Sequence, residues 1–212
     1  MFLDDFIKQN IKVEGEKVIL SDDFLLYLKR RITDEHRFKH SLSVANLVYR
    51  VSIANKVEEP LKYYLAAVLH DIGKNADKIE AKEIVDKYYH QYIDYPSYCY
   101  HQFVGEYYAI KDLCIFDEEV LGAIKFHCTG NELMSKIEKV VYACDKIDPL
   151  RDFDSSELIE AMMRDIDSGF IEVLHANYEY LSSKAHSKEE VDSIFNKLSS
   201  KCFKYYLNVE RK

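Results

Sequence analysis

The sequence predicts an all-α fold, a single helical bundle that spans residues 1–212. Apolar residues recur along almost the whole chain at the three- and four-residue spacing of amphipathic helices. The few helix breakers, 6 glycines and 3 prolines, fall between these runs. Because no linker, repeat or low-complexity stretch interrupts the pattern, we expect one domain built around one core.

Capping residues assign the starts of the helices in the first half of the chain. Ser21 is expected to cap "DDFLLYLKRRI", which carries acidic residues in its first turn and basic residues in its last, as the helix dipole favours. Thr33 is expected to cap the long helix that follows. Pro60 stands at the first position of "PLKYYLAAVLH", where its missing N–H costs nothing. A more polar helix is predicted over residues 77–93.

The second half continues with helices separated by short turns. The predicted helices cover 101–113, 117–127, 131–147, 155–166 and 168–181. Gly130 is expected to end the second of these helices and Pro149 the third. A last helix is expected to begin at Ser187, whose spacing to Glu190 is that of a capping box.

Composition excludes several classes of protein. A net charge of −8 argues against a protein that grips a nucleic-acid backbone. No run approaches the ~18 consecutive apolar residues of a membrane span. The 5 cysteines are odd in number, form no CxxC pair and follow no secretory signal, which favours reduced thiols and a cytoplasmic protein.

Histidines and aspartates stand at helix ends and within apolar helix faces. His70 and Asp71 are adjacent at the end of an apolar stretch, and imidazole nitrogen and carboxylate oxygen are ligands that suit divalent Fe, Mn, Zn or Co. A buried polar group without a partner lowers the stability of the fold by about 1–3 kcal/mol. Several such residues in one chain therefore suggest that they bind a common ligand. The other candidates are His40, His101, His127 and Asp145. We expect the remaining histidines to lie on the surface or in packing contacts, namely His36, His90, His175 and His186.

Four segments resemble the motifs of a known family. In order they are "RFKHSLSVA", "LAAVLHDIGK", "HQFVGEYYA" and "AIKFHCTGNELMSKIEKVVYACDKIDPLRDF". They are similar to the HD-domain phosphohydrolases, and specifically to the YqeK-like branch, which cleaves diadenosine tetraphosphate symmetrically. The resemblance is strongest over 37–153, and residues 155–212 are expected to add C-terminal helices to the same domain. Three positions differ from the usual family residues: Gln102, Cys128 and Asp148.

The resemblance implies a cofactor and its ligands. A divalent metal is expected, iron first, with manganese, cobalt or zinc as alternatives. The implied ligands of the primary ion are His40, His70, Asp71 and Asp145. If a second ion binds, His101 and His127 are its additional ligands, with Asp71 as a bridge; if only one binds, these histidines are expected to contact phosphate.

Attack on a phosphoanhydride also needs positive charge near the phosphates, because their oxygens repel a nucleophile. Lys74 follows His70 by about one turn, Arg37 precedes His40 by three residues, and Arg151 follows Asp145. The predicted catalytic residues are Asp71, Lys74, His101 and His127. The predicted substrate contacts are Arg37, His40, Asp71, Lys74, His101, His127, Cys128, Thr129, Asp145 and Arg151.

The expected function is therefore symmetrical hydrolysis of diadenosine tetraphosphate to two ADP. The alternatives are a nucleotidase or phosphohydrolase of the same type acting on another (deoxy)nucleotide, and a non-catalytic nucleotide-binding regulatory module. The expected partner is a small dinucleoside polyphosphate or nucleotide, with a homodimer as a further possibility. For the tyrosine-rich stretch from Tyr88 to Tyr108, core packing is favoured over an adenine pocket.

Overall fold

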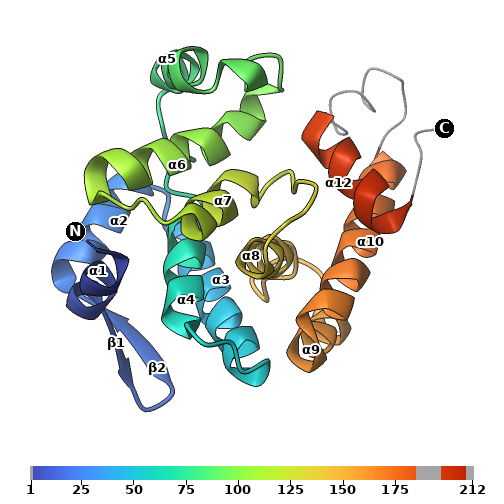
Figure 1. Ribbon diagram of the computed structural model, residues 1–212, viewed down its shortest axis with the longest axis horizontal. Coiled ribbons are helices and arrows are strands. Elements are labelled where there is room, and N and C mark those ends of the chain that lie inside the picture. Colours follow the sequence, from blue (N-terminus) through green and yellow to red (C-terminus); the bar gives the residue numbers. More distant parts are fainter. Residues whose placement is uncertain (1, 185–196, 209–212) are drawn as a thin grey trace.

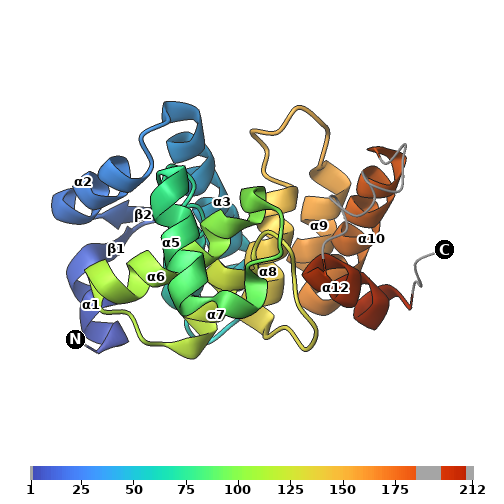
Figure 2. The ribbon, with the colours of Figure 1, turned by 90° about the horizontal axis from the view of Figure 1, so that it is seen from above.

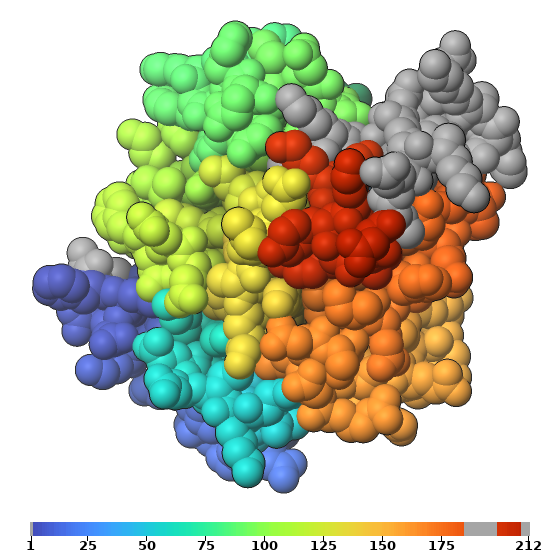
Figure 3. All heavy atoms as spheres, turned by 45° about the vertical axis from the view of Figure 1, so that its right-hand side comes forward, coloured from blue at the N-terminus to red at the C-terminus, as the bar shows by residue number. Residues whose placement is uncertain are grey.

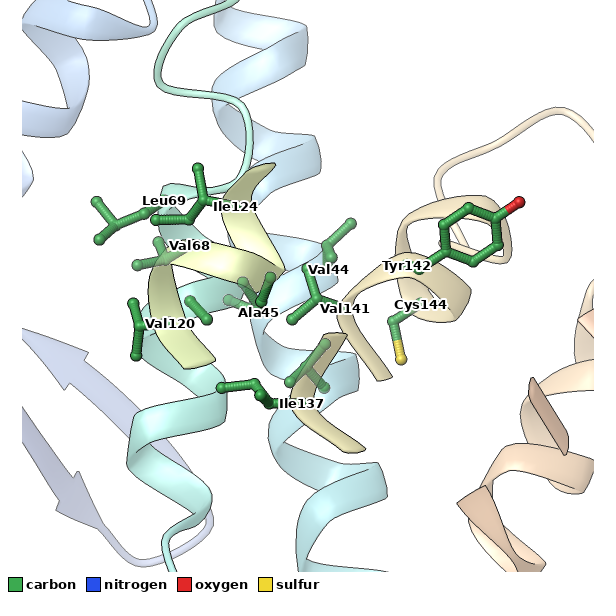
Figure 4. Packing of buried hydrophobic residues seen from close by; sticks show 14 of the residues in the cluster. Val44, Ala45, Val68, Leu69, Val120, Ile124, Ile137, Val141, Tyr142 and Cys144 are labelled. Carbon is green, nitrogen blue, oxygen red and sulfur yellow. The ribbon is translucent and has the colours of Figure 1, made fainter. Parts of the chain in front are cut away.

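Four helices meet in the middle of the computed structural model, which describes residues 2–184 and 197–208 (Figure 1). They are α3 (Glu35–Ala54), α4 (Pro60–Leu69), α7 (Glu118–Phe126) and α8 (Lys136–Lys146). Their inward faces bury aliphatic side chains, each stabilised by about 1.5–3 kcal/mol relative to exposure. Figure 4 shows this core with, among others, Val44, Ala45, Val68, Leu69, Val120, Ile124, Ile137 and Val141, all of them buried. The all-α prediction is confirmed.

The N-terminal segment adds one feature that the sequence analysis missed. Between α1 (Leu3–Asn10) and α2 (Asp22–Arg31), strands β1 (Ile11–Glu14) and β2 (Lys17–Leu20) form an antiparallel hairpin. Gly15, at the first position of the two-residue loop, has a φ of 63°, which a hairpin turn requires and glycine supplies without strain. This small sheet lies at the end of the molecule opposite α10 and α12 (Figure 2).

The tyrosine-rich middle segment serves mainly for packing. It comprises α5 (Lys78–Tyr88), the short 3-10 turns His90–Tyr92 and Ser97–Cys99, and α6 (Tyr100–Leu113). The ring of Tyr92 stacks on Phe103 with centroids 4.4 Å apart, and Tyr89 also packs on Phe103. Most tyrosines here are at least partly buried, so the packing interpretation describes the segment better than an adenine pocket does.

The C-terminal helices are α9 (Ser156–Arg164), α10 (Ile166–Lys184) and α12 (Lys197–Leu207). Helix α10 packs against α8, and both α9 and α12 pack against α10. The backbone N–H of Met134, in the loop before α8, donates to the Tyr206 hydroxyl at 2.7 Å. Figure 3 shows the red atoms of α12 directly beside the yellow atoms of this region. His186 and the predicted helix start with its Ser187–Glu190 capping box lie outside the described residues. That the whole chain forms one domain stays a prediction.

Helix boundaries follow the capping chemistry more closely than the apolar pattern. Ser21 caps α2 by accepting from the Phe24 N–H, as predicted. The predicted cap at Thr33 is wrong, because Asp34 accepts the Arg37 N–H instead. Helix α8 begins at the capping box of Ser135 and Glu138 rather than at residue 131. Among the described residues, no helix is both long and apolar enough to cross a membrane.

Candidate metal centre

A tight turn after α4 carries His70, Asp71 and Lys74. Hydrogen bonds between backbone groups three residues apart continue past the end of the helix. In one of them, the Lys74 N–H donates to the Asp71 carbonyl at 2.9 Å. Gly73 allows α6 to lie directly against this turn. A Cβ at position 73 would stand 2.2 Å from the His101 carbonyl oxygen and 2.6 Å from the Gly105 nitrogen. The missing side chain therefore brings His101 next to Asp71.

The four residues expected to hold a primary metal converge from α3, the turn after α4, and α8. The Nε2 atom of His40 lies 3.1 Å from Asp145 Oδ1. The Nε2 atom of His70 lies 3.8 Å from both Asp71 Oδ2 and Asp145 Oδ1. The ligand atoms of His40, His70 and Asp71 all lie within 4.8 Å of one another. These side chains face one common point.

A second group shares Asp71 with the first. Asp71 Oδ1 lies 3.5 Å from the Nε2 atoms of both His101 and His127, and these two nitrogens are 3.1 Å apart. All three side chains are buried. The two oxygens of Asp71 thus face different imidazoles, which is the arrangement expected of a carboxylate between two cations or between a cation and a phosphate.

Backbone carbonyls fix the tautomers of three of these imidazoles. A carbonyl can only accept, so each Nδ1 carries a proton, and in the neutral ring Nε2 presents a lone pair. The contacts, 2.7 Å each, are Ala67 for His70, Tyr98 for His101 and Ile124 for His127. His70 Nε2 is buried with no hydrogen-bond partner among the described residues. Such an unpaired lone pair between two carboxylates fits a divalent cation.

The electrostatics keep His70, Asp71 and Asp145 in the protonation states that ligands need. Burial lowers the pKa of His70 to about 4, so its imidazole is neutral at pH 7. Burial opposes ionisation of Asp71, but any positive charge on the surrounding imidazoles of His70, His127 and His101 holds its pKa well below the usual range. Burial likewise opposes ionisation of Asp145, and its basic neighbours, Lys146 first, outweigh it and hold the pKa well below the usual range. Both carboxylates are therefore ionised.

The role of Asp148 was not predicted from the sequence. This buried carboxylate lies 2.6 Å from His40 Nδ1 and accepts a hydrogen bond from Ser43 Oγ at 2.5 Å. It fixes the ring so that Nε2 faces Asp145, which is how carboxylates orient metal-binding histidines in other proteins. In the sequence, Asp148 is visible only as a second acidic residue three positions after Asp145 and before Pro149. Its role becomes evident only from its contact with His40.

Lys146 is a second residue of the centre that was not predicted from the sequence. Its ammonium group lies 2.8 Å from Asp145 Oδ2 and 3.1 Å from the carbonyl oxygen of His127. The side chain is only 19% exposed. A lysine beside an aspartate is common on helix surfaces, so the sequence alone offered no reason to single it out.

The structure brings two of the three predicted basic residues to the centre. Lys74 Nζ lies 3.2 Å from His101 Nε2, and Arg151 Nη2 lies 2.9 Å from Asp145 Oδ1. Arg37 is half-buried one turn before His40, but within the described part of the chain its side chain forms no ion pair.

The segment after His127 is only partly turned toward the centre. The Cys128 thiol contacts the side chains of Cys99 and His101. Thr129 is buried, and its hydroxyl lies within hydrogen-bonding distance of Gln102 Oε1, away from the imidazoles. Gly130 has the expected positive φ of 66°, but its N–H donates to the Phe126 carbonyl and is not available to a phosphate.

The predictions for the other described histidines and for the cysteines hold. His36, His90 and His175 are exposed, away from the centre. All 5 cysteines are free thiols.

Comparison with known proteins supplies the family. The HD domain model matches residues 37–150. The chain is 31% identical over 153 residues to a symmetrical bis(5'-nucleosyl)-tetraphosphatase of Halalkalibacterium halodurans, covering 71% of this chain and 81% of that protein. A protein of the same name from Bacillus subtilis is 28% identical, covering 77% and 88%. The crystal structure of a predicted HD superfamily hydrolase involved in NAD metabolism from Clostridium acetobutylicum superposes with a TM-score of 0.68 at 29% identity, covering 82% and 94%.

Fold and site together define a helical protein with a divalent-metal centre of histidines and aspartates. The chain belongs to the HD-domain family, and the paired His70 and Asp71 lie inside the matched residues.

Proposed function

We propose that this chain hydrolyses diadenosine tetraphosphate symmetrically, giving two ADP, with a divalent metal as cofactor. Two similar proteins carry the name of that activity. The observation that carries the proposal is the buried Nε2 of His70, which faces two carboxylates and has no hydrogen-bond partner among the described residues. We place the activity in the cytoplasm, in keeping with the free thiols.

His40, His70, Asp71 and Asp145 are the residues that would hold the primary ion, with iron as first choice and manganese, cobalt or zinc as alternatives. His101 and His127 would hold a second ion with Asp71, or contact phosphate if one ion binds. When bound there, a divalent ion would supply Lewis-acid chemistry, by which a phosphoryl oxygen is polarised and the pKa of water is lowered toward ~7. The second ligand group, Asp71, His101 and His127, is compatible with either one or two bound ions.

Three cations of the chain would stabilise the charge that develops on the phosphate oxygens. Lys74 and Lys146 are point charges beside His101 and Asp145 respectively. Arg151 adds a guanidinium, whose forked donors suit phosphate oxygens. Removing one such donor typically costs about 10²–10³ in kcat.

We assign protonation of the leaving group to His101 or His127. Both rings use Nδ1 for a backbone carbonyl, so only Nε2 can exchange a proton with the substrate. Lys74 contacts His101 Nε2 and can return a proton to it. ADP leaves more readily when its terminal oxygen is protonated, because the departing charge is smaller.

The direct test is to incubate metal-loaded protein with diadenosine tetraphosphate and to separate the products by chromatography. Two ADP are expected. ATP with AMP would contradict symmetrical cleavage. The Asp71→Asn variant serves as the inactive control, since it changes the residue common to both groups of ligands. Preferential turnover of a deoxynucleoside monophosphate in a parallel substrate panel would overturn the proposal in favour of a nucleotidase.

A further inference from the structure

A groove with a cavity volume of ≈360 Å³ runs along the outer face of α3, beside the segment that follows α8. Its apolar wall is made by Leu42 and Leu47 of α3 and by Pro149 and Leu150. Leu47 is buried, whereas Leu150 is 47% exposed and forms the rim. This volume lies at the lower end of the range for small-molecule sites, which suits one nucleotide rather than a whole dinucleotide.

The polar residues of the groove are basic or neutral. Lys39 stands at one end and Arg50 at the other, and Asn46 lies between them. At 1.5 Å per residue the backbone positions of Lys39 and Arg50 are about 16.5 Å apart along the helix axis. Among the residues that the structure describes, none of those lining the groove is acidic, although the full sequence carries a net charge of −8. This local excess of positive charge favours an anionic ligand.

Both cations are available to a ligand. Lys39 pairs with Glu35 at 2.8 Å, but the two side chains are 65% and 81% exposed, and such a pair contributes little. Arg50 is exposed, and in the described ranges it forms no ion pair. An incoming phosphate therefore displaces one weak contact at most.

The groove is connected to the metal centre by two short links. Ser43 lines the groove and donates to Asp148, which in turn contacts His40. Leu150 is followed directly by Arg151, whose guanidinium lies 2.9 Å from Asp145 Oδ1. The groove residue Lys39 directly precedes the metal-ligand candidate His40 in the sequence.

We propose that this groove is a purine-nucleotide subsite. The phosphates lie at the Lys39 end. The base packs against Leu42, Pro149 and Leu150, with the Asn46 amide paired to the adenine N6 and N7 atoms and the Arg50 guanidinium stacked on the ring. The shared chemistry, an adenine nucleotide with a short phosphate chain, has two sources: the far half of the dinucleotide substrate, or free ADP. The first source rests on the proposed function and the second does not.

The binding test uses the full-length Asp71→Asn protein, in which hydrolysis does not consume the ligand, and titrates it calorimetrically with ADP. Arg50→Glu reverses one groove charge, and Asn46→Phe fills the groove from an exposed helix position. Lys12→Glu, on the exposed face of β1, changes the net charge by the same amount as Arg50→Glu and serves as the matched control. Thermal melting verifies that each variant is folded.

We expect both groove variants to weaken ADP binding at least tenfold and Lys12→Glu to change it less than twofold. Unchanged ADP binding in folded groove variants overturns the subsite. In the otherwise wild-type protein, a raised KM for diadenosine tetraphosphate with kcat retained identifies the far half of the substrate. An unchanged KM with lost inhibition by ADP identifies the free nucleotide. If the protein does not hydrolyse the dinucleotide at all, the ADP titration still decides whether the groove binds a nucleotide.

Discussion

The Nε2 atoms of His101 and His127 lie 3.1 Å apart, although each ring already donates its Nδ1 proton to a backbone carbonyl. Two neutral rings held in this way point lone pairs at each other, and the oxygen of Asp71 at 3.5 Å adds a negative charge. The arrangement is stable only with positive charge close by. Lys74 supplies part of it, at 3.2 Å from His101. A bound cation, or a proton shared between the two Nε2 atoms, would supply the rest.

This relationship predicts how metal content divides between the two groups of ligands. His127→Ala removes a ligand from the second group only. If the parent protein binds two ions, the variant should retain about one, and if the parent protein binds one ion, the variant should retain it. Asp71→Asn alters both groups and should lose most of the metal. Elemental analysis after gel filtration measures both. Equal loss of metal in the two variants would contradict the division into a primary and a secondary group.

Metal removal should also lower thermal stability. A ligand present at about 100 times its Kd stabilises the folded state by about 2.7 kcal/mol. For a chain of this size that corresponds to roughly 5–10 °C in Tm. We expect the chelated protein to melt lower by that amount and to recover when Mn²⁺ or Fe²⁺ is added back. A melting temperature that does not change with chelation would argue against a metal held by buried residues.

Asp148 predicts a distinct effect on metal affinity. Asp148→Asn keeps the shape but removes the charge that orients His40 through a 2.6 Å contact. Loss of such an outer carboxylate typically weakens metal binding about 10–100-fold. Ser43→Ala, which removes only the hydrogen bond to the other oxygen of Asp148, should have a smaller effect. Competition titrations with a fluorescent chelator compare the two, and equal affinities in Asp148→Asn and the parent protein would refute the role.

Asp148 also marks what could be predicted from the sequence. The six metal-ligand candidates are imidazoles and carboxylates at helix ends or within apolar helix faces, and their residue types and order carry the signal. Asp148 and Lys146 act through contacts between α3, α8 and the segment after α7, and such contacts depend on how helices pack. A single chain shows which residues share a helix face, but not which side chain on a second helix meets it.

The fold also contains some elements that could be predicted from the sequence and others that could not. The helices were predictable because apolar spacing and caps are local, and Ser21 and Pro60 stand where they were expected. The hairpin was missed because residues 11–20 are short and only Gly15 marks the turn. The first turn of α8 was misplaced because residues 131–134 have apolar spacing, whereas the Ser135–Glu138 capping box determines where the helix begins.

The metal-free protein should bind metal more tightly as pH rises. Burial opposes protonation of His40, but hydrogen bonds to Asp145 and Asp148 outweigh it and raise its pKa to about 9. Because this pKa is raised above its ordinary value of 6.5, the charged pair stabilises the metal-free fold below about pH 6.5 and this contribution is lost as pH rises through about 9.

A metal binds the neutral imidazole, so uptake releases this proton. Apparent affinity should therefore increase about tenfold per pH unit below about pH 9, because His70 is already neutral. Co²⁺ titrations at pH 6.5, 7.5 and 8.5 measure the slope. A slope near zero would show that His40 carries no proton in the metal-free protein. Asp148→Asn should flatten the dependence.

Gly73→Ala tests the close contact between the turn and α6. The added methyl group would stand 2.2 Å from the His101 carbonyl, which is backbone and cannot move aside alone. We expect a loss of about 1–3 kcal/mol of stability, as for overpacked sites, together with loss of metal from the second group. Gly105→Ala is the control, because its Cβ would meet an Ile124 methyl group at 3.2 Å, a contact that a side chain can relieve. Unaltered metal content in Gly73→Ala would mean that the spacing of Asp71 and His101 does not depend on this glycine.

Lys146→Met separates a role in catalysis from a role in holding the metal. The ammonium group lies 2.8 Å from Asp145, so its removal leaves that carboxylate more negative toward a cation, and metal affinity should hold or rise. The same removal takes a positive charge away from the phosphate oxygens, and kcat should fall about 10²-fold. Lys136→Met, at an exposed position on the same helix, controls for the lost charge. If Lys146→Met lowers kcat no more than Lys136→Met does, the ammonium group does not act on the substrate. If instead metal content and kcat fall together, Lys146 supports the fold of the centre rather than the reaction.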